Sequence, residues 1–290
     1  MRYGAKLILG YLFGTDIAGR DLAVYSDDTF LVSFPRSGST WTRFLIANLV
    51  HPEIEVSFAN LERLIPDTSS QSNRRLKQTP RPRLIKSHEY FDPRYRRVMY
   101  IVRDPRDVVL SYYDFQRKYR HFDDSFSLDQ YVTGFIQGTI NHWGTWGTWA
   151  ENVNSWLATR SGSEDFLLLR YEDMKDDTPR ELERIARFLG IEPAPERLTR
   201  AIQLSSADRM RKLEQAQSDQ WVATRNKRND IPFVGGAEAG AWRTELSAKS
   251  IAEIENAWGG LMRSLGYELQ AVETGATPSP LTPILGTARK

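Results

Sequence analysis

One short segment near the N-terminal end limits the possible folds most. Residues 29–34, Thr-Phe-Leu-Val-Ser-Phe, are mostly apolar and rich in β-forming side chains, which is typical of a strand buried on both faces. A polar stretch with one glycine follows at 35–40, and residues 41–50 then form a helical pattern that ends at His51-Pro52. A buried strand leading through such a loop into a helix is typical of an α/β domain with a parallel sheet.

The same alternation continues along the chain. Further strands are predicted at 84–86, 97–102 and 165–171, and helices from Pro105, over 141–158, over 178–190 and over 247–265. The residues between 69 and 82 are polar and are predicted as a loop. We therefore expect one α/β domain over 1–270, with a central, mainly parallel sheet flanked by helices, and a loosely ordered tail at 271–290.

Composition removes several classes of chemistry. The chain has 290 residues and no cysteine, which excludes thiol catalysis, disulfides and cysteine-based zinc sites. The four histidines have no short metal-ligand spacing, so no metal site is expected. The net charge of +2 gives no indication of a nucleic-acid partner.

The N-terminal residues contain a short apolar run at 7–13. This run is well below the roughly 18 residues of a transmembrane helix and lacks a small-residue cleavage site. A buried or surface-docked helix is favoured over a targeting or membrane-lying segment. We expect a cytoplasmic protein without a transmembrane segment.

The loop at 35–41, Pro-Arg-Ser-Gly-Ser-Thr-Trp, has the features of an anion site. Its backbone N–H groups precede a helix, whose dipole adds positive potential at this end. Gly38 permits a close approach, Ser39 and Thr40 add hydroxyl groups, and Arg36 adds a charge. The alternative is an ordinary strand-to-helix turn capped by Thr40. No lysine follows Gly38, so the loop does not fit the nucleotide-triphosphatase pattern.

Two other strand ends carry polar groups. Arg103 ends the strand at 97–102, and Ser111 follows eight residues later, about two helical turns along. The two could share a phosphate, or Arg103 could belong to a helix cap. Lys86 and His88 end the strand at 84–86, where His88 is a candidate general base, although a lone histidine is more often structural.

Together these stretches resemble the sulfotransferases that use 3′-phosphoadenosine 5′-phosphosulfate (PAPS), closest to the cytosolic, small-molecule type. The resemblance rests on FPRSGSTW at 34–41, KSH at 86–88, YIVRDPRDVVLSYYDF at 100–115 and LRYEDM at 169–174. It runs from about residue 30 to about residue 267. It implies a P-loop-like sulfotransferase fold with a PAPS-binding core at about 28–270, and transfer of a sulfuryl group to a hydroxyl of a small molecule, with adenosine 3′,5′-bisphosphate as the other product and no metal.

The resemblance also implies residue roles. His88 would accept the acceptor's proton, Arg36 would face the breaking bond, and Lys86 would lie near the sulfuryl group. Arg103 and Ser111 would hold the 3′-phosphate. Trp41 would pack near the adenine, and Tyr171 and Ser205 would contact the purine. The implied PAPS-binding residues are Arg36, Ser37, Gly38, Ser39, Thr40, Trp41, Arg103, Ser111, Tyr171 and Ser205.

The sequence departs from the family pattern at two cofactor motifs. Arg36 stands where the family has lysine, which keeps the charge but does not readily donate a proton. Gly235-Gly236 stands where the family has an arginine and a lysine for the 3′-phosphate. Arg225, Lys227 and Arg228 are candidate replacements. The position of a family phenylalanine that stacks on adenine is Ala207.

Alternative functions are a P-loop-like kinase and a non-catalytic relative that binds a nucleotide. The acceptor is not identified by the sequence. Seven aromatic residues could line an apolar pocket for an aromatic acceptor, or equally belong to the core: Phe91, Tyr95, Tyr112, Tyr119, Phe122, Trp143 and Trp146. The sequence indicates no oligomeric state.

Overall fold

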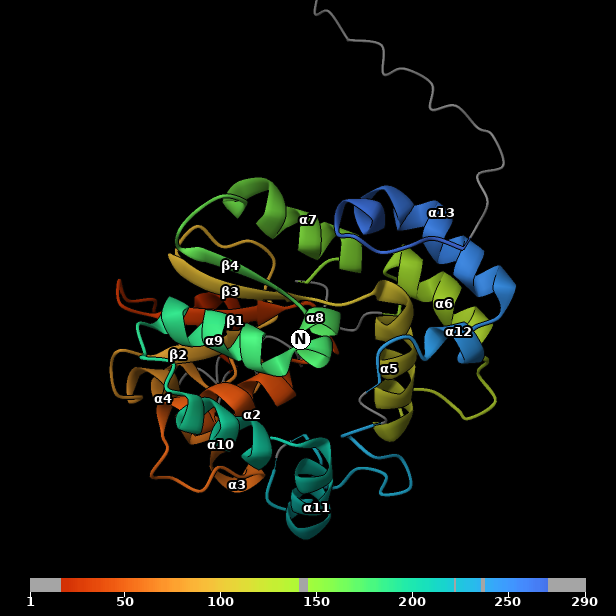
Figure 1. Cartoon of the computed structure of the whole chain (residues 1–290). Helices are drawn as coiled ribbons and strands as arrows, with labels where there is room; N and C mark the ends of the chain where they lie inside the picture. The colour runs from red at the N-terminus through yellow and green to blue at the C-terminus, as the bar shows by residue number, and fades with distance from the viewer. Residues whose placement is uncertain (1–16, 141–145, 222, 236–237, 271–290) are drawn as a thin grey trace, which may run out of the picture.

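The centre of the molecule is a sheet of four parallel strands in the order β2-β1-β3-β4. The computed structural model describes residues 17–140, 146–221, 223–235 and 238–270. Its strands are β1 (Thr29–Ser33), β2 (Leu84–Ser87), β3 (Arg97–Val102) and β4 (Phe166–Arg170). All four carboxyl ends therefore lie at one edge of the sheet (Figure 1). The predicted α/β class with a parallel sheet is confirmed.

Helices cover both faces of this sheet (Figure 1). In chain order they are η1 (Gly19–Asp21), α2 (Ser39–Val50), α3 (Phe58–Leu64), α4 (Asn73–Lys77), α5 (Pro105–Lys118), α6 (Leu128–Gln137), α7 (Trp149–Arg160), α8 (Tyr171–Asp176), α9 (Thr178–Leu189), α10 (Pro195–Leu204), α11 (Ala207–Gln217), α12 (Trp242–Glu245) and α13 (Ala248–Ser264). Helices α6, α7 and α13 lie over one face, and α2, α9 and α10 over the other.

The strands divide the apolar side chains between two cores. Successive side chains of a strand point to opposite faces. Phe30 and Val32 of β1 therefore pack into the core beneath α5, α6, α7 and α13, whereas Leu31 packs into the core with α2, α3, α9 and α10. The central strands β1 and β3 are buried on both faces, as their continuous apolar sequence predicts.

Capping residues set the helix ends at several predicted places. The Asp104 carboxylate accepts a hydrogen bond from the Arg106 N–H, and Pro105 occupies the first turn of α5. Helix α9 begins after Asp177 and ends at Gly190, which adopts a left-handed φ of 72°. These boundaries confirm the helices predicted from Pro105 and over 178–190.

Three sequence expectations are corrected. Helix α2 begins at Ser39 with Gly38 as its cap, so the turn capped by Thr40 is wrong. The helix expected over 141–158 begins only at Trp149, because a reciprocal cap between Thr148 and Glu151 starts it there. The polar stretch 69–82 contains the short helix α4.

Some expectations fall outside the described residues, namely the helix at 7–13, the first part of the helix over 141–158 and the tail at 271–290. Among the helices that the structure does describe, none combines the length and the apolar character needed to cross a membrane.

Candidate active site

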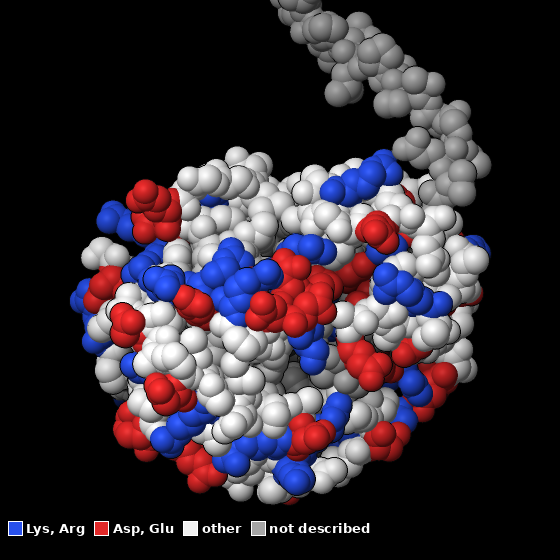
Figure 2. All heavy atoms as spheres, viewed as in Figure 1, with Lys and Arg blue, Asp and Glu red and all other residues white. Residues whose placement is uncertain are grey.

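A cavity of about 560 Å³ opens at the carboxyl edge of the sheet. Side chains from the β1–α2 loop, the end of β2, α5 and the segment after α11 line it. Figure 2 shows a hollow on this face between α8 and α11, bordered by basic and acidic side chains. Ligands of parallel α/β sheets bind at this edge, so the cavity is the candidate active site.

The β1–α2 loop requires its glycine. Gly38 has a φ of 98°, and a Cβ there would lie 2.4 Å from the Tyr171 ring. Arg36 also has a positive φ, of 67°. This unusual backbone directs the start of α2 toward the cavity, which Gly38, Ser39 and Thr40 line.

Two buried polar atoms near this loop lack a protein partner. Among the residues that the structure describes, neither Ser37 Oγ nor Arg103 Nε makes a hydrogen bond. Buried donors normally find a partner. Arg103 lines the cavity, so its guanidinium N–H suits a bound anion. Ser37 is fully buried and does not line the cavity, so the implied contact of its hydroxyl with the 5′-phosphosulfate does not fit its position.

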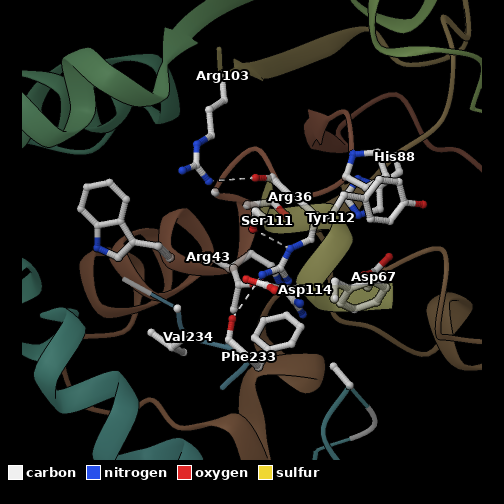
Figure 3. Close-up of a pocket in the computed structure, with 18 of the residues that line it drawn as sticks. Arg36, Arg43, Asp67, His88, Arg103, Ser111, Tyr112, Asp114, Phe233 and Val234 are labelled. Carbon is white, nitrogen blue, oxygen red and sulfur yellow. Dashed lines mark hydrogen bonds between the residues drawn. The ribbon is translucent and has the colours of Figure 1, made fainter. Parts of the chain in front are cut away.

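Arg103 joins the three cofactor motifs. Its Nη1 donates to the Arg36 carbonyl at 3.2 Å (Figure 3). Its Nη2 donates to the Glu238 carbonyl at 3.0 Å. Its guanidinium lies over the Tyr171 ring, 4.4 Å from the centroid. The structure thus brings together residues from the ends of β1, β3 and β4 that are far apart in sequence.

Arg36 reaches into the cavity toward α5. Its Nε donates to Ser111 Oγ at 3.0 Å, and its Nη2 donates to the Phe233 carbonyl at 3.2 Å (Figure 3). The guanidinium carbon lies 5.2 Å from the Phe115 centroid and 4.6 Å from the Phe233 centroid. Burial, and then the nearby Arg103, lower the pKa of Arg36 to about 10. Two cations close together in a partly desolvated space favour an anionic ligand.

Trp41 and Ser205 lie at the adenine side implied by the resemblance. Trp41 lines the cavity, and its ring meets the Tyr171 ring edge to face with centroids 5.9 Å apart. Its Nε1 donates to the Ser205 carbonyl at 3.1 Å. Ser205 is fully buried and its hydroxyl accepts from Asn48. Ser205 therefore supports Trp41 from behind, and an implied direct contact with the purine does not fit its position.

His88 lines the cavity at the end of β2. Its Nδ1 lies 2.7 Å from the Ser33 carbonyl, and a carbonyl can only accept, so Nδ1 carries the proton. Nε2 is then an unprotonated acceptor. Burial, followed by the cation of Lys86, lowers the pKa of His88 to about 3. The imidazole is therefore neutral at ordinary pH, as a base must be.

Lys86 has a partner that sequence reasoning missed. Its Nζ lies 2.7 Å from Oδ2 of Asp67, and both side chains line the cavity. Asp67 comes from the segment between α3 and α4, nineteen residues earlier. A single aspartate in a polar stretch carries no recognisable signal, and only the three-dimensional arrangement reveals the pair.

The aromatic candidates divide into two groups. Tyr112, Tyr119 and Trp146 line the cavity. Tyr95, Phe91 and Phe122 pack into the core or against it, and Trp143 lies outside the described residues. The cavity therefore has an aromatic wall on the side of His88, and the His88 and Trp146 rings are 5.1 Å apart.

Among the candidate replacements for the missing 3′-phosphate contacts, Lys227 lines the cavity and lies 4.1 Å from the Tyr119 centroid. Arg228 instead pairs with Asp124 and Asp230. Arg225 is exposed and does not line the cavity.

The Gly240-Ala241-Trp242 segment is tied to α5. The Asp107 carboxylate accepts from the Gly240 N–H at 2.7 Å and from the Trp242 N–H at 3.1 Å. Ala207, at the start of α11, is absent from the cavity wall. Among the described histidine, aspartate and glutamate side chains, no group of three or more is placed to hold a metal ion.

Comparison with known proteins identifies the family. The model of the sulfotransferase domain matches residues 26–266. The 3-beta-hydroxysteroid sulfotransferase of Cavia porcellus is 30% identical over 202 residues, which are 66% of this chain and 68% of that protein. Sulfotransferase 2A1 of Homo sapiens is 29% identical over 203 residues, 66% of this chain and 69% of that protein.

Solved structures share the fold. Retinol dehydratase in a complex with retinol and PAP superposes with a TM-score of 0.74 at 18% identity, over 90% of this chain and 88% of that one. Mouse sulfotransferase SULT7A1 complexed with PAP superposes with a TM-score of 0.67 at 20% identity, over 85% of this chain and 87% of that one. The chain belongs to the sulfotransferase family, and it is a PAPS-dependent sulfotransferase. The resemblance is confirmed, and the kinase alternative is set aside.

Proposed function

We propose that this enzyme transfers the sulfuryl group of PAPS to a hydroxyl of a small, largely apolar acceptor, with His88 as the general base. The observation that carries this proposal is the tautomer of His88. Its Nδ1–H donates to the Ser33 carbonyl, which leaves Nε2 as the only acceptor of a ring that lines the cavity. A neutral imidazole at this place can take the proton of a hydroxyl as it attacks.

The cofactor loop and α5 supply the groups that would hold the nucleotide. Backbone N–H groups at the start of α2, together with Arg36, would bind the 5′-phosphosulfate. The free Nε of Arg103 and the Ser111 hydroxyl would bind the 3′-phosphate. When bound, PAPS would supply a sulfuryl group attached to a phosphate leaving group, and Arg36 would offset the negative charge that develops on that leaving group.

The adenine would lie between Trp41 and Tyr171, which meet edge to face beside Gly38. Lys227 would add a cation that offsets the missing arginine and lysine at 235–236. Each group acts through charge or position, so the proposed reaction relies on electrostatics and orientation, as related phosphoryl transfers do.

Two observations support an apolar hydroxyl acceptor. The cavity beside His88 has Tyr112, Tyr119 and Trp146 in its wall. The relatives include a 3-beta-hydroxysteroid sulfotransferase, and retinol dehydratase structures hold retinol or androsterone beside PAP. The particular acceptor is a matter for experiment. A cytoplasmic location and one domain over 1–270 stay predictions from the sequence.

Calorimetric titration with adenosine 3′,5′-bisphosphate tests donor binding. We expect Arg103→Ala to weaken binding by about 10- to 100-fold and Ser111→Ala by a few-fold, because each removes a charge-assisted or neutral hydrogen bond to phosphate. Arg187→Ala, which removes one side of an exposed ion pair on α9, is the control and should bind as the wild type does.

Turnover is measured in parallel with labelled PAPS against phenols, alcohols and sugars. Absence of nucleotide binding, or equal binding by all three variants, would contradict the proposed donor site. Binding without transfer to any hydroxyl would contradict the proposed reaction.

A further inference from the structure

A short loop segment extends the sheet beyond its edge strand. The Lys86 N–H donates to the Pro66 carbonyl at 2.8 Å, and the Thr68 N–H donates to the Lys86 carbonyl at 3.0 Å. Asp67 thereby forms a parallel bridge with Lys86. Because bridged residues point their side chains to the same face, the backbone itself places the carboxylate beside the ammonium.

The Asp67 carboxylate is fixed through both oxygens. Oδ2 accepts from Lys86 Nζ at 2.7 Å, and Oδ1 accepts from the N–H and the hydroxyl of Ser69 at 2.8 and 2.7 Å. The Lys86 side chain is 5% exposed and that of Asp67 is 13% exposed. Figure 3 shows Asp67 on the same side of the pocket as His88.

A second buried ion pair adjoins the pair of Lys86 and Asp67. Arg43 of α2 pairs with Glu62 of α3 at 2.9 Å, and the other carboxylate oxygen of Glu62 accepts from the Asp67 N–H at 3.1 Å. The charged groups that face Lys86 are thus Asp67 from the bridging loop, Glu62 from α3 and Arg43 from α2. The titratable group beyond it on the same strand end is His88.

We infer that Asp67 is a positioning residue of the reaction, which holds Lys86 as a fixed, protonated ammonium in the cavity wall beside the base His88. This inference rests on the proposed function. In that reaction the ammonium would contribute positive charge to the sulfuryl oxygens. The charge of Lys86 also lowers the pKa of His88 and so disfavours its protonated form, an effect that the more weakly acting carboxylate of Asp67 opposes only in part.

The direction of the pH dependence follows from the surroundings of Lys86. Burial lowers the pKa of Lys86, and the carboxylate of Asp67 opposes that lowering. Without Asp67, the buried ammonium faces Arg43 with weaker compensation, and its pKa falls further. It then loses its proton at a lower pH, so the alkaline limb of the kcat/KM profile moves toward neutrality.

The test is the pH profile of kcat/KM for Asp67→Asn, measured with PAPS and an acceptor that the wild type uses. Relative to the wild type, we expect a deficit of about tenfold or more near pH 9 and a smaller deficit near pH 6. Affinity for adenosine 3′,5′-bisphosphate should stay unchanged. Asp67→Glu, which retains the charge, should keep the alkaline limb of the wild type.

Asp28→Asn is the matched control. Asp28 forms a completely buried ion pair with Arg83 beside the opposite ends of β1 and β2, away from the cavity. The same substitution there should lower the thermal midpoint without moving the pH profile. This comparison separates loss of a buried pair from loss of a charge beside the base.

A constant deficit of Asp67→Asn at every pH, or an equal shift of the profile by Asp28→Asn, would overturn the inference. If Asp67→Asn does not fold, the double variant Asp67→Asn/Lys86→Met leaves no lone buried charge. Loss of turnover with nucleotide affinity retained supports the inference, and turnover equal to the wild type contradicts it. If the wild type itself transfers no sulfuryl group, the proposed function fails instead.

Discussion

At the scale of single residues, the environment of His88 determines its chemistry. A solvent-exposed histidine has a pKa near 6.5 and is partly protonated at neutral pH. His88 is 9% exposed, its Nδ1–H is committed to Ser33, and Lys86 lies close by. Burial and the Lys86 cation lower the pKa of His88 and outweigh the opposing effect of the hydrogen bond to Ser33, which fixes the proton on Nδ1 and leaves Nε2 free of one.

Replacing His88 with glutamine should remove the base and leave the nucleotide site intact. We expect kcat to fall by about 10²- to 10⁴-fold while the affinity for adenosine 3′,5′-bisphosphate changes little. Steady-state kinetics and calorimetry measure the two quantities. His51→Gln, at the partly exposed end of α2, is the control and should leave both unchanged. Retention of more than about a tenth of the turnover by His88→Gln would exclude His88 as the base.

At the scale of elements, the β1–α2 loop and the start of α8 depend on each other. The Tyr171 ring lies where a side chain at position 38 would begin. Tyr171 in turn receives the Arg103 guanidinium on its face. The shape of the proposed nucleotide site therefore depends on a contact between two loops that follow non-adjacent strands, β1 and β4.

Gly38→Ala should damage this contact. A Cβ 2.4 Å from the ring, at a φ of 98°, forces Tyr171 or the loop to move. We expect a loss of about 2 kcal/mol or more in the free energy of unfolding and a weaker affinity for adenosine 3′,5′-bisphosphate. Urea denaturation and calorimetry measure these changes.

Gly190→Ala separates the effect of the contact with Tyr171 from the effect of the positive φ. Gly190 also has a positive φ, of 72°, but no atom lies within 4 Å of its added Cβ. It should cost about 1 kcal/mol of stability and leave nucleotide affinity unchanged. Equal effects of the two alanines would show that the contact with Tyr171 is unimportant.

At the scale of the whole molecule, Arg106 connects the C-terminal segment to the cofactor motif. Its guanidinium pairs with Asp104 at 2.6 Å and with Glu255 of α13 at 2.5 Å. It also lies 3.6 Å from the centroid of a Trp242 ring. The chain after residue 240 is thus held against α5 by one buried cation as well as by Asp107.

Arg106→Met should therefore destabilise the whole fold. It leaves two buried carboxylates without their cation, which typically costs about 3–5 kcal/mol. Chemical denaturation measures the loss. Arg187→Met, in an exposed pair with Glu183, should cost less than about 1 kcal/mol. A loss of similar size in both variants would contradict a structural role for the buried network.

Much of the fold could be predicted. The strands β1 and β3 are continuous apolar runs, and the helices α5, α9 and α13 each have a strong local pattern and a capping residue. Helix α4 could not be predicted, because its five residues lie in a polar stretch without apolar periodicity. The late start of α7 depends on the Thr148 cap, a local signal that the preceding tryptophans obscured.

Part of the candidate site could likewise be predicted from the sequence, and part could not. Three parts of the site follow the carboxyl ends of parallel strands, namely the loop around Gly38, Arg103 and His88. The topology of the sheet alone therefore brings them together. The partner of Lys86 depends on a bridge between Asp67 and a strand nineteen residues later, which neither segment shows by itself. The position of Ser205 behind Trp41 likewise depends on how α10 packs against α2.

Strand β2 lies at one end of the sheet and pairs on one side with β1. On its other side, within the described part of the chain, it pairs only with the bridge at Asp67. His88 follows directly after this strand, whereas the proposed nucleotide-binding groups follow the interior strands β1 and β3 and the outer strand β4. An edge strand offers unpaired backbone N–H and C=O groups to which another chain can pair, and the short bridge at Asp67 therefore also covers part of the edge beside the proposed base.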